Sequence, residues 1–133
     1  MLKKHVFAIL FVSWVLFITM LSLFSFSGID TSGVTIPYAD KIVHFSFYLI
    51  FAILGCLFLR ERTQGGLTIE KAVLSILFAA ITYGIFIEVL QYTITTNRMA
   101  EFGDIIANTL GAIVGVSLIK WFFSKERPLK WKI

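Results

Sequence analysis

The first candidate for chemistry in this sequence is a polar pair inside an apolar run. In GIFIEVLQY, residues 84–92, Glu88 and Gln91 are surrounded by Ile, Phe, Val and Leu. A carboxylate is costly in such surroundings unless other groups compensate it. Glu88 is therefore expected to have polar partners elsewhere in the chain.

Candidate partners lie in other apolar runs. Burial raises the pKa of a carboxyl group toward the useful range, so Glu88 could act as a general base with His44 as its acid or orienting partner. Lys41 and Arg98 could hold an anionic phosphate or carboxylate. The predicted catalytic residues are Glu88 and His44, and the predicted substrate-binding residues are Asp40, Lys41, Tyr48, Gln91, Arg98, Asp104 and Asn108.

The composition places these residues in a membrane protein. The chain has 133 residues, of which 58% are hydrophobic and 15% charged, with a mean hydropathy of +0.88. A hydrocarbon core about 30 Å thick needs roughly 20 apolar residues per helical span. The predicted fold is an all-α four-helix bundle, a single transmembrane domain over residues 1–133 with retained spans at about 6–24, 42–59, 72–94 and 105–123.

The basic residues predict how the bundle is oriented. All lysines and arginines except Lys41 and Arg98 lie at the N-terminus, in the loop after the second span, or from residue 120 onward. By the positive-inside rule, both termini are predicted to be cytoplasmic. The formal net charge of +4 reflects this topology, so no nucleic-acid partner is expected.

The spacing of the polar residues predicts that they face one another. On a helix, positions i, i+4 and i+7 share one face, and small residues let helices approach closely in lipid. Each of three spans has such a stripe, with polar residues in its outer half and small residues in its inner half. This arrangement predicts an outward-opening pocket between the three spans. The first span has no such stripe and is expected to be only a wall of the bundle. The stripes are Asp40, His44, Tyr48 and Gly55; Gly84, Glu88, Gln91 and Thr95; and Asp104, Asn108, Gly111 and Gly115.

Simpler interpretations exist for the members taken singly. Asp40 and Asp104 each precede an apolar run and would serve as helix N-caps. His44 would be a core histidine bonded to a neighbouring helix. The Gly111-x-x-x-Gly115 pair is typical of helix packing, or of a dimer face. The convergence of the group is therefore stronger evidence for a site than any one member.

The residues also resemble a known family. The pattern Asp40-Lys41-x-x-His44-Phe45-x-x-Tyr48, Glu88-x-x-Gln91, Arg98 and Asp104-x-x-x-Asn108-x-x-Gly111-x-x-x-Gly115 resembles the VanZ-like family of small bacterial membrane proteins. The resemblance implies a four-span bundle in the bacterial plasma membrane and a contribution to low-level resistance to the glycopeptide teicoplanin. It carries over Asp40, Lys41, His44, Glu88, Gln91, Arg98, Asp104 and Asn108 as the characteristic positions.

Three hypotheses for function follow. In the first, the pocket binds or modifies a lipid, a lipid-linked cell-wall intermediate, or the acyl-bearing antibiotic itself. In the second, His44, Glu88 and Asp104, with Asn108 or Asp40, hold a divalent metal; the single histidine and the absence of an HExxH motif count against it, and neither a metal nor a cofactor is predicted. In the third, the chain is a non-catalytic scaffold or regulator of a cell-wall enzyme or transporter, with that enzyme or a second copy of the chain as its partner.

Overall fold

Four helices make up most of the described chain. The computed structural model describes residues 4–23, 39–94, 102–124 and 130–132. These residues contain α1 (Val6–Leu23), α2 (Ala39–Thr63), α3 (Ile69–Ile94) and α4 (Phe102–Phe122), and no strand. Each helix is long and apolar enough to cross a membrane. The predicted all-α fold with four spans is therefore confirmed.

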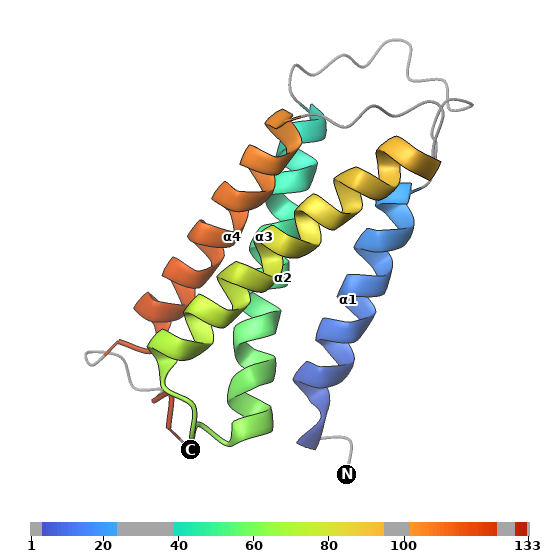
Figure 1. Cartoon of the computed structure of the whole chain (residues 1–133). Helices are drawn as coiled ribbons and strands as arrows, with labels where there is room; N and C mark the ends of the chain where they lie inside the picture. The colour runs from blue at the N-terminus through green and yellow to red at the C-terminus, as the bar shows by residue number, and fades with distance from the viewer. Residues whose placement is uncertain (1–3, 24–38, 95–101, 125–129, 133) are drawn as a thin grey trace.

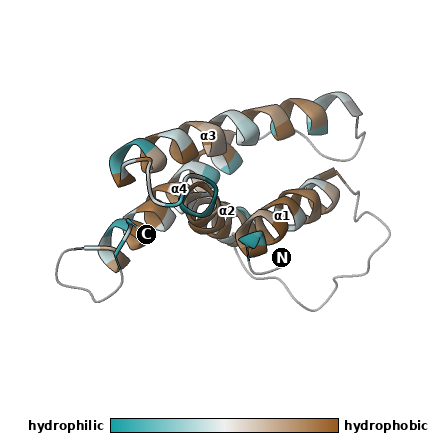
Figure 2. Cartoon of the chain, turned by 90° about the horizontal axis from the view of Figure 1, so that it is seen from below, coloured by the Kyte–Doolittle hydropathy of each residue, from teal (hydrophilic) through white to brown (hydrophobic). Residues whose placement is uncertain are grey.

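The helices alternate in direction, with α2 at the centre. Successive helices run up and down in Figure 1, so α1 begins and α4 ends at the same end, here called the terminal end. The opposite end, where α2 and α4 begin, is called the site end. Viewed along the bundle in Figure 2, α1 and α4 flank α2, and α3 lies across them. In agreement with this, α2 contacts each of the other three helices.

The closest approach is between α2 and α4, and it depends on glycine. A Cβ atom added to Gly111 would lie 2.2 Å from the carbonyl oxygen of Phe45, and one added to Gly115 would lie 2.6 Å from that of Leu49. Small residues allow such backbone proximity in membranes. These glycines are therefore used inside the chain, so the suggestion that they form a dimer face is wrong.

The terminal end is closed by contacts between distant segments. The Glu61 carboxylate of α2 accepts hydrogen bonds from the backbone N–H groups of Phe7 and Ala8, at 3.1 and 3.2 Å. These donors have no partner inside α1, so a carboxylate stabilises that helix end. The Trp131 indole donates to the carbonyl of Leu67 at 2.7 Å, tying the chain beyond α4 to the α2–α3 connection.

The rest of the surface suits a hydrocarbon environment. Large apolar side chains such as Leu16, Leu74, Phe78 and Leu110 are exposed on the outside of the bundle. On α1 only Ile18 and Ser22 are buried. Exposing these apolar side chains to water would be unfavourable, whereas contact with lipid has no such cost.

Candidate functional site

Three helices bring a histidine and two carboxylates together at the site end. His44 of α2, Glu88 of α3 and Asp104 of α4 each place one metal-ligating atom within 4.8 Å of the others. All three are buried, with exposed fractions of 5%, 2% and 8%. The stripes identified in the sequence do converge here, while the catalytic roles of Glu88 and His44 stay a prediction. We call these residues, with Lys41 and Asn108, the polar cluster.

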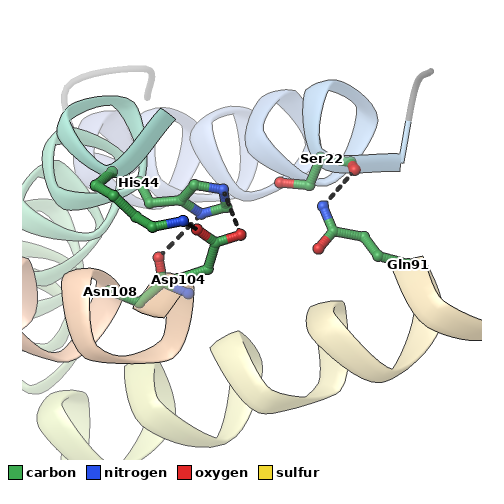
Figure 3. Close-up of polar contacts among 6 residues, drawn as sticks. Ser22, His44, Gln91, Asp104 and Asn108 are labelled. Atoms are coloured by element: carbon green, nitrogen blue, oxygen red, sulfur yellow. Dashed lines mark hydrogen bonds and ion pairs between the residues drawn. The ribbon is translucent and has the colours of Figure 1, made fainter. Parts of the chain in front are cut away.

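Asp104 links two side chains of α2. Its Oδ1 accepts from the Lys41 ammonium at 2.6 Å, and its Oδ2 lies 3.5 Å from His44 Nε2 (Figure 3). The N-cap interpretation of Asp104 is wrong because α4 begins two residues earlier, at Phe102. In the first turn its carboxylate still benefits from the positive end of the helix dipole, and its side chain is directed across to α2.

Asn108 fixes the orientation of the histidine. Its Oδ1 lies 3.1 Å from His44 Nδ1 (Figure 3). An amide oxygen only accepts, so Nδ1 carries the hydrogen and donates it. The other ring nitrogen, Nε2, is left facing the Asp104 carboxylate. Asn108 Nδ2 is also buried and finds no hydrogen-bond partner among the described residues, so the cluster retains a donor for a further acceptor.

Gln91 interacts with α1 more directly than the sequence suggests. Its Nε2 donates to the backbone carbonyl of Ser22 at 2.6 Å. Figure 3 shows this pair beside, but separate from, the contacts among His44, Asp104 and Asn108. Gln91 therefore makes a bond to the first span that the sequence does not predict. That span is also more than a wall, since Thr19 hydrogen-bonds the Tyr83 hydroxyl.

Tyr48 lies in the aromatic core next to the cluster. It is 2% exposed, and its ring centroid is 6.0 Å from those of both Phe51 and Tyr83. This placement matches a packing role, so Tyr48 has little surface with which to bind a substrate. Of the other predicted site residues, Arg98 and the side chain of Asp40 lie outside the described residues.

The members of the polar cluster are largely buried, and the outward-opening pocket stays a prediction. Lys41 is its most accessible member, with 25% of its side chain exposed against 11% for Asp104. Two hollows elsewhere do not include it. One is an apolar groove of about 300 Å³ between α2 and α4, which contains Leu57 and Trp121, and the other is a recess of about 550 Å³ at the terminal end around Arg60 and Glu61. Among the described residues of the cluster, Lys41 is the one most open to a ligand.

These features define a class of protein: a multi-pass membrane protein whose polar residues are gathered from three spans at one end of the bundle. The VanZ/LLP1 family model matches residues 3–123 of the chain. The chain therefore belongs to the VanZ/LLP1 family, as its residue pattern predicts. No curated protein and no solved structure matches it.

Proposed function

We propose that this protein binds the polar head of an amphiphilic envelope molecule at the polar cluster and thereby contributes to teicoplanin resistance. The observation that carries the proposal is the burial of His44, Glu88 and Asp104 from three separate helices at one point. Ionisable residues within spans are rare and usually functional. A purely structural role would need fewer charges, because buried ion pairs stabilise little for their cost.

The proposed ligand is anionic at its head and apolar beyond it. Lys41 is the accessible cation of the cluster, and an ammonium suits a phosphate or carboxylate group. The buried Asn108 Nδ2 provides a further donor. The apolar exterior of the bundle lets an acyl chain stay in the bilayer while the head reaches the cluster. A lipid, a lipid-linked cell-wall intermediate and an acylated glycopeptide all share this chemistry.

The positive-inside rule supports an extracytoplasmic position for the cluster in a bacterial plasma membrane. Arg60, Arg62 and Lys71 lie at the terminal end, around the α2–α3 connection. Basic residues favour the cytoplasmic side. The site end would then face the compartment in which glycopeptides act on cell-wall intermediates.

The test is teicoplanin susceptibility in cells that carry the protein or a variant, with its membrane level measured in parallel. Glu88→Gln keeps the side-chain volume and removes the charge, and Lys41→Gln removes the cation. Both are expected to return susceptibility to that of cells lacking the protein at unchanged levels. His5→Gln, an exposed histidine at the terminal end, is the matched control and is expected to behave as the wild type.

A glycopeptide without an acyl chain extends the test. The proposal expects the variants to change susceptibility to teicoplanin and leave susceptibility to the non-acylated compound as it was. Equal membrane levels with unchanged teicoplanin susceptibility would refute the proposal. If the Glu88 and Lys41 variants are lost from the membrane but the His5 variant is not, the result would favour the scaffold alternative. In that alternative, the cluster only holds the helices together.

A further inference from the structure

We infer that the polar cluster is a binding site for one divalent transition-metal ion, with zinc as the best fit, held by His44 Nε2, Asp104 Oδ2 and a carboxylate oxygen of Glu88. The sequence alone predicts no metal, because it places one histidine, His44, within the predicted spans and has no recognisable spacing of ligands. The inference goes beyond the proposed function, and its test does not depend on resistance.

The first argument is the orientation of the histidine. Since Nδ1 faces Asn108 Oδ1 at 3.1 Å, Nε2 is the ring nitrogen directed toward Asp104, where its lone pair would serve as a ligand. Metal-ligating histidines generally have their second nitrogen held by such an oxygen. Asn108 is thus a positioning residue that presents Nε2 as a ligand.

The second argument is the gap between Nε2 and the carboxylate. They are 3.5 Å apart, beyond the range of about 2.7–3.2 Å for an N–H···O hydrogen bond. Two neighbouring ligands of a tetrahedral zinc ion, with bonds of about 2.0–2.2 Å, lie about 3.4 Å apart. The spacing of these two atoms therefore matches a shared ion better than a direct hydrogen bond.

The third argument is the geometry of the three donors. An ion at the centre of a triangle with 4.8 Å sides, the upper limit here, lies about 2.8 Å from each corner. Zinc bonds to nitrogen and oxygen ligands are about 2.0–2.2 Å, so each side chain needs to move by less than about 1 Å. Mixed nitrogen and carboxylate ligands favour zinc or manganese over magnesium, which prefers oxygen alone.

The charges around the site are compatible with a cation. Asp104 and Glu88 supply two carboxyl groups within the cluster, which attract a cation in their ionised form. Lys41 contacts the other oxygen of Asp104, Oδ1, which leaves Oδ2 available. Three protein ligands leave one coordination position open, the arrangement of zinc sites that act on a bound substrate. A phosphate or carboxylate head entering past Lys41 would occupy that position.

The experiment measures metal binding by the purified chain in detergent, after removal of any affinity tag and treatment with a chelator. The protein is equilibrated with zinc, manganese or magnesium ions, and its metal content is determined by mass spectrometry after gel filtration. We expect about one zinc ion per chain and no retention of magnesium. Competition with a chromophoric chelator gives the affinity, and a melting curve with and without zinc gives a second readout.

Three variants and a control test the assignment of the ligands. Glu88→Gln and His44→Gln each remove one ligand, and Asn108→Ala removes the positioning bond; each is expected to weaken zinc binding about 10- to 100-fold or more. His5→Gln should bind zinc like the wild type. Gel-filtration profile and helical content show whether each variant is folded. If Glu88→Gln does not fold, His44→Gln decides the outcome.

Failure to retain zinc by the folded wild type would overturn the inference, as would affinity unchanged in folded Glu88→Gln and His44→Gln. The outcomes also separate this inference from the proposed function. If the wild type does not bind zinc but the Glu88 variant loses resistance, the metal site is refuted and the proposed amphiphile site stands. Zinc binding with unchanged susceptibility keeps the metal site and removes the proposed role in resistance.

Discussion

Adding one methyl group at Gly111 should separate α2 from α4 and disturb the polar cluster as well. The added Cβ atom would lie 2.2 Å from the carbonyl oxygen of Phe45, whereas real Cβ contacts essentially never fall below 3.0 Å. The two backbones must therefore move apart by about 0.8 Å. A gap of about 0.5–1 Å already forfeits a quarter to a half of the contact energy of the atoms concerned. Overpacking of this kind typically costs about 1–3 kcal/mol.

The same displacement reaches the cluster because Phe45 directly follows His44 and Gly111 is less than one turn from Asn108. The 3.1 Å bond between His44 and Asn108 should lengthen, so function should fall together with stability. The assay is the free energy of unfolding of Gly111→Ala in mixed detergent micelles, beside susceptibility measured in cells. Alanine itself raises helix propensity by up to about 1 kcal/mol over glycine, so any net loss comes from the clash.

Gly103→Ala is the matched control in the same helix. There the new Cβ atom meets the flexible Lys41 side chain, at 3.0 Å from Cε, and the side chain can move aside. We expect this variant to be as stable as the wild type or slightly more so. If Gly111→Ala is as stable as Gly103→Ala, α2 and α4 are not in the close contact described and the packing argument is refuted.

Three further predictions concern contacts outside the cluster. Gln91→Leu removes the donor to the Ser22 carbonyl and should lower the free energy of unfolding by about 1 kcal/mol; an unchanged value in detergent unfolding would contradict the contact. Glu61→Gln weakens the acceptor of the first N–H groups of α1 and should cost about 0.5–2 kcal/mol, seen as faster hydrogen exchange at Phe7, while equal exchange rates would argue against the cap. Trp131→Phe keeps an aromatic ring but loses the hydrogen bond from the indole to Leu67. Limited proteolysis should therefore cut the chain after α4 faster than in the wild type. An unchanged cutting rate would show that this bond does not hold the segment.

The four helices could be predicted from the sequence, but their ends could not. The apolar runs mark the part of each helix that lies in hydrocarbon, whereas caps and turns decide where a helix stops. The second run ends at Leu59, yet α2 continues to Thr63. The chain then turns through Gln64 and Gly65, whose positive φ angles of 52° and 75° are left-handed. Glycine tolerates this conformation. The apolar run that predicts the helix gives no information about this turn.

The buried faces could also be predicted, because a helical repeat fixes which residues share a side. His44, Glu88 and Asn108 are all buried, as their spacing indicates. The repeat does not say which neighbouring helix each residue meets. Glu88 and Gln91 are on one stripe, but Gln91 contacts α1. The angle at which α3 crosses the other helices decides this, and it results from packing over the whole bundle.

The contact between Glu61 and α1 bears on how the protein enters the membrane during synthesis. Glu61 is near the end of α2, so the ribosome must complete the second span before this carboxylate can reach the first turn of α1. Until then, the backbone N–H groups of Phe7 and Ala8 lack the Glu61 carboxylate as their acceptor. The first two spans therefore form the smallest unit that the insertion machinery can release with the first N–H groups of α1 bonded to Glu61. A chain truncated between these two spans should be cleared by membrane proteases.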